Sequence, residues 1–405
     1  MPVRGANSVD DGILMVMSNL TNIAIAPDRS SINVSPGLTW SDVYAYLIDF
    51  DRTAVGGRIS PIGVSGLALG GGISLHGNQY GWAADNVLEY EVVLANGEVA
   101  IANETTHNDL FWALKGGGPN FGIVTNFKLR AIPSTKVLAG IYTINGTEME
   151  PLMSAVANYT AHNTDAFSHI LPLVEVVDKS TTIGLVLFYD SPTQAGPACL
   201  DEFFAIPSIK STVEFKTIGD FVVERNTFSI PDINDVLFAG TIVGRDYDDV
   251  HTGLKIIHDT FYEKLSELDS AVPAEALEYI GIAWQPLPEI WMNASQRINP
   301  SGNPLGLDPS KGLYIAWAGI VMWNDSRYDT AVADWAAEVT GVIDRTTKAK
   351  GLYDPFKYMN DAAGFQDVYG GYGAKSRGKL LEISRKYDPW RVFQTSMPGG
   401  FKIGV

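Results

Sequence analysis

The sequence predicts an α+β protein with more than one globular region, and three observations support this. The chain has 405 residues, 46% of them hydrophobic, so it can bury a large core. Short β-type runs rich in glycine fill the first third of the chain. Long helical patterns alternate with strands in the middle, which is typical of an α+β unit. We therefore expect three regions, residues 1–133, 134–352 and 353–405.

The first region begins with local signals for one strand and one helix. Residues 13–17 form a short apolar run of strand type. Thr39 and Asp42 have the spacing of a capping box, in which each side chain receives a backbone N–H at the start of a helix. This pair predicts a helix over residues 40–47.

A hairpin and a second helix follow in the same region. Residues 87–95 and 99–102 are predicted strands, joined by a turn at Asn96-Gly97, because Asn and Gly adopt positive φ at low cost. Asn108 is the expected cap of a helix over residues 109–115, which consecutive glycines then end.

The later regions carry longer helices. Apolar residues at four-residue spacing predict a helix over residues 254–268, and alternating runs predict strands at residues 182–189 and 313–322. A last helix is expected at residues 376–387, ended by Pro389, because proline disfavours helix at the residue before it.

Charge and composition exclude several functions. The net charge is −17, whereas nucleic-acid binding depends on clustered Lys and Arg, so we expect no nucleic-acid partner. The apolar stretches are far below the roughly 18 residues of a membrane helix, so no span is predicted. The histidines have no metal-ligand spacing, and the single cysteine cannot form an internal disulfide. We expect no metal.

Localisation stays open. We expect no secretory leader in the printed sequence, because no basic start, apolar stretch and cleavage site precede the first structural segment. Sequons for N-glycosylation are nevertheless dense, which is typical of a secreted glycoprotein. They lie at Asn19, Asn33, Asn103, Asn145, Asn158, Asn293 and Asn324.

Two glycine clusters concentrate the chemistry, at residues 61–74 and 116–125. Backbone without side-chain bulk allows N–H groups to approach a phosphate or a planar ring. Taken alone, a glycine run is more often a turn than a ligand cradle. A dinucleotide fingerprint requires a glycine motif between a strand and a helix, but the second cluster follows a helix and enters a strand, which disfavours a Rossmann site.

Several ordered segments together resemble the berberine bridge enzyme-like FAD-linked oxidases, which have the vanillyl-alcohol oxidase fold. They are the two glycine clusters, residues 80–87, 358–360, 372–373, 387–393 and 398–401. The resemblance implies a PCMH-type FAD-binding domain over residues 1–133. It also implies a substrate domain with an antiparallel sheet and covering helices, and a closing segment from residue 353 that returns to the FAD domain.

By the same resemblance, FAD contacts are expected in both glycine clusters, in the start of the strand near residue 87, and in the closing segment. The expected cofactor-binding residues are Ile62, Gly63, Val64, Gly66, Leu67, Gly70, Gly71, Gly72, Ser74, Asp85, Asn86, Val87, Gly122, Ile123, Val124, Tyr358 and Asn360.

Two departures from the family pattern concern the flavin attachment. Family members carry a Gly-Gly-His-type loop, with a flavin-linked histidine, just before the segment that resembles residues 2–12. We expect Met1 to be an internal methionine of a longer protein, which leaves the FAD domain incomplete at its N-terminus; the alternative is a relative without that loop. Ser60 stands near the place of the second attachment, a cysteine. Noncovalent FAD is therefore expected.

The catalytic candidates are Asp361 and His76. In related oxidases a tyrosine often follows the Tyr-x-Asn triplet and takes the substrate's hydroxyl proton, but this chain has Asp361 there. An aspartate can act as the base when burial raises its pKa; otherwise it is a solvated loop carboxylate. His76 follows the glycine cluster and is either a proton carrier above the flavin or a surface residue. Trp317 lies on a predicted strand that we expect to face a pocket.

Three functions remain open. The first is an FAD-linked oxidoreductase that oxidises an alcohol, an amine or an activated C–H group of a small molecule, with O₂ as acceptor, in secondary metabolism. The second is a redox-neutral cyclase on the same fold. The third is a flavin-free remnant without catalysis. Composition does not determine the substrate, the product or the oligomeric state.

Overall fold

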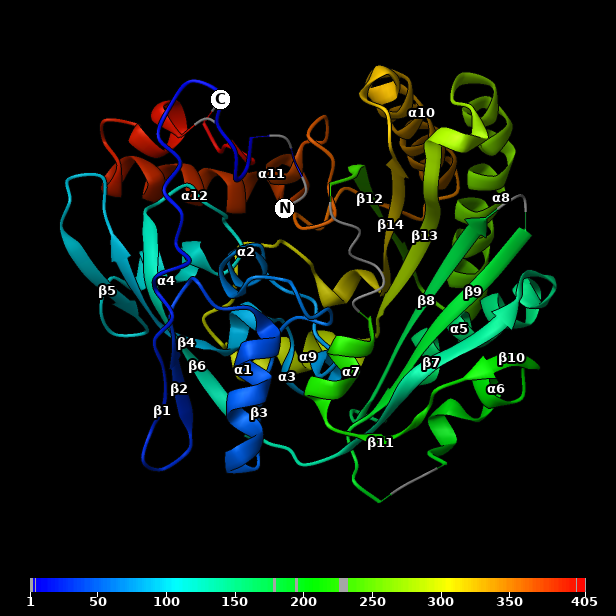
Figure 1. The fold of residues 1–405 in the computed structure, drawn as a ribbon, viewed down its shortest axis with the longest axis horizontal. Coiled ribbons are helices and arrows are strands. Elements are labelled where there is room, and N and C mark those ends of the chain that lie inside the picture. Colours follow the sequence, from blue (N-terminus) through cyan, green and yellow to red (C-terminus); the bar gives the residue numbers. More distant parts are fainter. Residues whose placement is uncertain are drawn as a thin grey trace.

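Two β-sheets organise the chain, and Figure 1 shows them side by side with short helices and loops between them. The computed structural model describes residues 3, 5–177, 180–193, 196–225, 232–397 and 399–404. Met1 and Pro398, which the sequence analysis uses, lie outside the described residues. In the described part, no helix is both long and apolar enough to cross a membrane.

The first sheet is antiparallel and belongs to the N-terminal region. Its strand order is β1 (Ile23–Ile25), β2 (Ser31–Val34), β6 (Ile123–Pro133), β4 (Val87–Val93) and β5 (Val99–Asn103), and β3 (Arg52–Ala54) pairs with β6. Helices α1 (Trp40–Leu47), α2 (Val64–Leu69) and α4 (Asn108–Leu114) pack in this region. Its buried core includes large aromatic side chains: Trp40, Trp82, Tyr90, Phe121 and Phe127.

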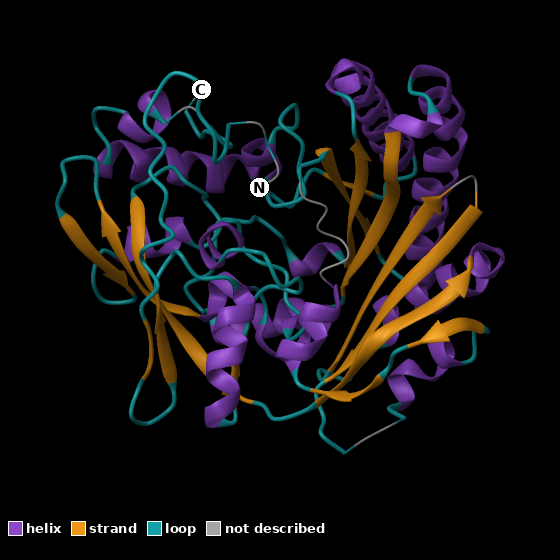
Figure 2. Cartoon of the chain, viewed as in Figure 1, coloured by secondary structure: helices purple, strands orange, loops and turns teal. Residues whose placement is uncertain are grey.

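The second sheet is larger and also antiparallel. Its order is β10 (Ser208–Ser211), β7 (Val137–Asn145), β9 (Ser180–Tyr189), β8 (Ser168–Val177), β13 (Leu277–Leu287), β14 (Leu313–Trp323), β12 (Asn234–Gly244) and β15 (Tyr353–Asp354), and β11 (Glu214–Lys216) pairs with β7. Helices α5 (Met149–His162), α8 (Tyr247–Ala271) and α10 (Asp329–Ala349) lie on its outer face (Figure 2). Its inner face is turned toward the first unit.

Short elements join the two units. Helices α3 (Gly77–Tyr80), α7 (Ile218–Glu224) and α9 (Glu289–Ile298) lie between the sheets. The closing segment carries α11 (Val368–Gly371) and α12 (Gly373–Tyr387), and α12 returns to α4. Asp109 of α4 accepts hydrogen bonds from Lys386 Nζ at 2.6 Å and from Tyr387 Oη at 2.7 Å. The end of the chain therefore helps to frame the interface between the units.

Most predicted elements are confirmed, and two are wrong. The capping box of Thr39 and Asp42 is present, and residues 254–268 lie within α8. Residues 13–17 are not a strand, because they pair with no described strand and their side chains are largely exposed. Asn108 is not the cap of α4: the carbonyl of His107 accepts the first helical hydrogen bond, from Phe111 N at 2.9 Å.

Candidate active site

The first glycine cluster wraps around the short helix α2. Gly63 precedes the helix, and a Cβ built on Gly63 or on Gly66 meets no atom within 4 Å. Gly71 and Gly72 have φ of +101° and +83°, a conformation that side chains rarely adopt. A Cβ on Gly70 would lie 2.3 Å from Asn360 Oδ1, so only glycine permits this approach. The cluster therefore leaves open space beside Gly63 and Gly66 and admits the closing segment at Gly70.

Around these glycines the other predicted residues have different exposures. Ile62 is exposed, and its carbonyl accepts from Trp40 N at 3.0 Å. Val64 is buried in the core. Ser74 is also buried, and its hydroxyl accepts from Gly56 N at 3.2 Å. Only Ile62 of these three therefore presents its side chain to the surface.

Tyr358 and Asn360 bind the glycine segment directly. The hydroxyl of Tyr358 accepts from Ile73 N and from Asn360 Nδ2, both at 3.0 Å. Asn360 Nδ2 also lies 3.2 Å from the carbonyl of Leu67. In the described part of the chain, the buried Asn360 Oδ1 and the buried Ser65 Oγ have no hydrogen-bond partner. These two atoms remain available to a bound group.

Asp361 follows Asn360 and lies near the Arg58 guanidinium. Both residues are half-buried. Burial raises the pKa of the Asp361 carboxyl to about 6, although the charge of Arg58 acts in the opposite direction. Among the described residues, none donates a hydrogen bond to this carboxylate or forms an ion pair with it. Near pH 6 the Asp361 carboxyl is therefore partly protonated and partly ionised, and its ionised form can accept a proton.

Among the described residues, no hydrogen bond, ion pair or ring contact joins His76 to the Tyr358–Asp361 segment. It is buried at the start of α3, with its ring edge-on to Phe188 at 5.1 Å. Its Nε2 lies 3.7 Å from Asp190 Oδ2, which accepts from Gln79 Nε2 at 2.8 Å. Burial lowers the pKa of His76, and Asp190 opposes this. A catalytic role for His76 stays a prediction.

Asp85 holds the two units together through its side chain. The buried carboxylate accepts from Trp82 N at 3.0 Å, from Ser295 Oγ at 2.6 Å, and from the Asn299 and Asn303 amides at 2.9 Å each. These donors come from both sides of the interface, because Ser295 lies in α9. Protein donors thus occupy the carboxylate of Asp85. A contact between FAD and the backbone of Asp85 stays a prediction.

The remaining predicted contacts lie at the starts of β4 and β6 in the first sheet or just before them. Asn86 is buried, and its amide donates to the carbonyls of Tyr80 and Trp82 at 2.8 and 2.9 Å. Val87 begins β4, and Gly122 immediately precedes β6. Ile123 and Val124 are the first residues of β6 and pair with β4. Their roles as cofactor contacts stay predictions.

The inner face of the large sheet is lined differently from our expectation. Trp317 does not face this side: it packs against Phe238 at 6.2 Å in the core beneath the outer helices. Side chains alternate along a strand, so Ala316 and Ala318 occupy the inner face instead. Ala316 pairs with Gln285 of β13, which therefore shares that face.

These features fit FAD. The open positions at Gly63 and Gly66 leave room for a group close to the backbone, and the unpartnered Ser65 Oγ and Asn360 Oδ1 offer polar atoms to it. Both the glycine segment and the closing segment contribute to this space, through Ser65 and Asn360. Within the described residues, no three His, Cys, Asp or Glu side chains are placed to hold a metal ion.

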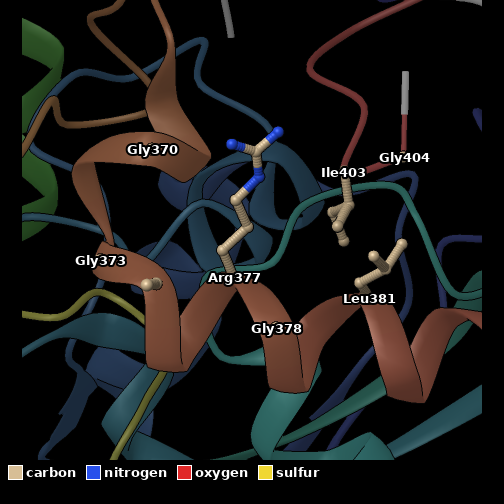
Figure 3. Close-up of a pocket in the computed structure, with 8 residues that line it drawn as sticks. Gly370, Gly373, Arg377, Gly378, Leu381, Ile403 and Gly404 are labelled. Atoms are coloured by element: carbon tan, nitrogen blue, oxygen red, sulfur yellow. The ribbon is translucent and has the colours of Figure 1, made fainter.

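A pocket of about 570 Å³ lies elsewhere, on the surface along α12 (Figure 3). In Figure 3 the Arg377 side chain rises from α12, while Leu381 and Ile403 approach one another. The lining residues are Gly370, Gly373, Ala374, Arg377, Gly378, Leu381, Ile403 and Gly404. It contains no residue of the predicted site.

The fold and these residues define a flavin-dependent oxidoreductase. A family model described as an FAD binding domain matches residues 2–103. An FAD-dependent monooxygenase of Penicillium roqueforti is 32% identical over 426 aligned residues, covering 100% of this chain and 80% of the relative. The bifunctional solanapyrone synthase of Alternaria solani is 32% identical and is covered to 75%, over 99% of this chain.

Solved structures show the same fold. The 6-hydroxy-D-nicotine oxidase of Arthrobacter nicotinovorans matches with a TM-score of 0.77 at 20% identity, over 96% of this chain and 84% of that one. The berberine bridge enzyme of Eschscholzia californica matches with a TM-score of 0.67 at 17% identity, over 94% and 79%. The chain belongs to the FAD-linked oxidoreductases and shares the fold of the berberine bridge enzyme, and its cofactor is FAD. The resemblance found in the sequence is confirmed.

Two residues near the candidate site, Arg58 and Gln285, were not predicted from the sequence. The two residues are far apart in the chain, but the Arg58 guanidinium donates to Gln285 Oε1 across the interface. The signal available in the sequence was the position of Arg58 beside Gly56 and Gly57, just before the first glycine cluster. The sequence did not indicate Gln285, because its position in an alternating strand is equally typical of a residue in the core.

Proposed function

We propose that the protein oxidises a hydroxyl group of a small organic molecule, with Asp361 as the base and O₂ as the final electron acceptor. The observation that carries this proposal is the position of the Asp361 carboxylate. It directly follows Asn360, which contacts the glycine segment, and it is half-buried and unpaired among the described residues. The fungal relatives, an FAD-dependent monooxygenase and a bifunctional synthase, support a flavin-dependent reaction.

In this proposal Asp361 and Tyr358 have different roles. Bound FAD would supply the hydride acceptor, and O₂ would take up the two electrons and two protons to give hydrogen peroxide. An Asp361 oxygen takes the hydroxyl proton while the hydride leaves the adjacent carbon, so the alcohol becomes a carbonyl. Tyr358 cannot serve as this base near neutral pH, because burial raises its pKa to about 12 and its hydroxyl is engaged by Ile73 and Asn360.

The residues proposed to hold FAD are those that line the space beside α2. They are the backbone of residues 62–74, the Ser65 hydroxyl and the amide oxygen of Asn360. Glycine at position 70 lets Asn360 lie against this backbone. Arg58 keeps part of the Asp361 population ionised, because its charge lowers the pKa of that carboxyl.

The test begins with the purified full chain saturated with FAD and freed of unbound flavin. Hydroxylated compounds, including benzylic alcohols, hydroxy acids and sugars, are mixed with it without O₂, and the loss of flavin absorbance is followed. We expect at least one class to bleach the flavin, and admitted O₂ to restore the absorbance with formation of hydrogen peroxide. Product without flavin bleaching or O₂ uptake would instead establish a redox-neutral reaction, and a chain that retains no flavin would contradict the proposal.

A further inference from the structure

A buried lysine that the proposed mechanism does not use directly follows α4, beside the second glycine cluster. Lys115 is only 2% exposed. Its Nζ donates to the carbonyl oxygen of Asp85 at 3.4 Å, which is a long hydrogen bond, and it lies 4.2 Å from the centroid of the Phe111 ring. Among the described residues, no carboxylate forms an ion pair with this Nζ. Lysine is almost never fully buried without an ionic partner, so the position of Lys115 is unusual.

Lys115 lines a small pocket with a volume of about 170 Å³. An engineered cavity of about 150 Å³ in another protein holds benzene, so this pocket has room for a molecule of that size. Its buried lining residues include Phe111, Trp112, Lys115 and Asn299. Exposed residues, among them Glu104 and Ser301, line the same space. The pocket therefore connects the buried lysine with solvent.

A second buried polar group in this pocket has an unused atom. Asn299 Nδ2 donates to Asp85 Oδ1 at 2.9 Å and to the carbonyl of Gly302 at 2.8 Å. Asn299 Oδ1 is buried, and among the described residues it accepts no hydrogen bond. A buried acceptor without a donor is costly, so buried polar atoms are normally satisfied by protein, water or a ligand. The pocket thus offers an amine and a free acceptor to the molecule that occupies it.

The surroundings of the amine also change its protonation. Burial lowers the pKa of Lys115 to about 8, the charges of Asp85 and Glu104 raise it, and the charge of Arg130 lowers it. About a tenth of Lys115 is then neutral at pH 7, whereas a lysine with the ordinary pKa of about 10.4 is neutral in less than about 0.1% of molecules. The neutral amine is the form that attacks a carbonyl carbon. Lys115 therefore combines an enlarged nucleophilic fraction with space for an electrophile.

We propose that Lys115 captures a small aldehyde in this pocket as an imine. The neutral Nζ adds to the carbonyl carbon, one water molecule leaves, and a C=N bond joins Nζ to that carbon. No electrons are gained or lost, so the step needs neither an oxidant nor a reductant. Asn299 Oδ1 is the acceptor that the pocket offers to the hydroxyl of the first adduct, and the Phe111 and Trp112 rings offer an apolar wall to its substituent. This inference is independent of Asp361 and of the proposed oxidation.

The test traps the imine by reduction. The full chain, saturated with FAD, is incubated at pH 7 with propionaldehyde and cyanoborohydride, and peptide mass spectrometry locates the alkylated lysines. Two exposed lysines are internal references: Lys379 lines the same pocket, and Lys350 lies elsewhere, at the end of α10. We expect Lys115 to be alkylated about ten- to a hundredfold faster than either reference, because its neutral fraction exceeds that of an ordinary lysine. Its rate is expected to level off above about pH 8.

Two controls separate capture in the pocket from general reactivity. Pyrene-1-carboxaldehyde is too large for a space of about 170 Å³, so we expect it to alkylate the two reference lysines but not Lys115. Ser301→Trp places a bulky side chain at an exposed lining position and is expected to abolish the rate advantage of Lys115 while the references react as before. Equal rates at the three lysines, or no alkylation of Lys115, overturn the proposal. So does a Ser301→Trp variant with the wild-type pattern, or alkylation of Lys115 by the pyrene aldehyde.

Discussion

Replacing Asp361 by Asn tests the catalytic base with almost no change in shape. A positioned general base contributes roughly a hundred- to ten-thousandfold to the rate, so kcat/KM is expected to fall by about that factor. In the wild type the carboxyl has a pKa of about 6. Ionisation with that pKa increases kcat/KM about tenfold between pH 5 and pH 7. The Asn variant is expected to lose this acidic limb and to show a flat profile over that range.

The same carboxyl also affects stability, with a definite sign. In the folded protein the pKa of the Asp361 carboxyl is raised from 3.8 to about 6. The folded state therefore holds the proton more tightly than the unfolded chain does. Ionised Asp361 therefore destabilises the fold, and stability is lost as pH rises from about 4 through about 6. Asp361→Asn removes this dependence. Arg58→Gln is expected to shift the kinetic limb to higher pH, because the Arg58 charge lowers this pKa.

The assay is flavin reduction under anaerobic conditions, followed by stopped-flow absorbance from pH 5 to pH 8 with the first substrate that bleaches the flavin. The FAD content of each preparation is matched, so that a loss of cofactor is not read as a loss of chemistry. An Asn variant that keeps the wild-type rate and the acidic limb would refute the assignment of Asp361. A variant that loses FAD rather than rate would show a structural role instead.

Four further substitutions, one of them a control, test the construction of the site. Gly70→Ala is expected to destabilise the fold by about 1–3 kcal/mol and to lower FAD retention, because its Cβ would lie 2.3 Å from Asn360 Oδ1. The control is Gly378→Ala in α12, outside the proposed FAD site, where a Cβ meets no atom within 4 Å; it is expected to leave FAD retention unchanged and stability unchanged or slightly improved. Urea unfolding and flavin content check this pair. Trp317→Ala is expected to cost about 3–5 kcal/mol through a core cavity without changing KM, so a selective KM effect would contradict the observed orientation. Asp85→Ala is expected to cost about 3 kcal/mol, because buried donors lose their acceptor; thermal unfolding equal to the wild type would contradict this.

Local sequence patterns predicted an element correctly where the interactions that form it lie within one short segment of the chain. The capping box at Thr39 is an interaction between residues three positions apart, and α8 follows from apolar spacing along one helix. The strand at residues 13–17 was wrong for the opposite reason. A strand needs hydrogen bonds from a partner, and its apolar composition alone does not provide one.

In the candidate site, too, residues with a local constraint were predicted from the sequence, whereas orientations set by tertiary packing were not. Glycines that need positive φ, such as Gly71 and Gly72, are visible in sequence because few other residues adopt that backbone. Asp361 was found through its place after a recognisable triplet. The orientation of Trp317 was not predictable, because alternation along a strand defines two faces but does not say which face meets the helices.

The sequence by itself determined the family and the cofactor, because both are recognised from glycine-rich motifs with fixed local geometry. Only the tertiary structure brought Arg58 to Gln285 and placed the Arg58 charge near Asp361. These contacts join residues separated by most of the chain, and the charge balance that they create depends on burial and on distances between units. That balance is a property of the folded interface, and no single segment of the sequence contains it.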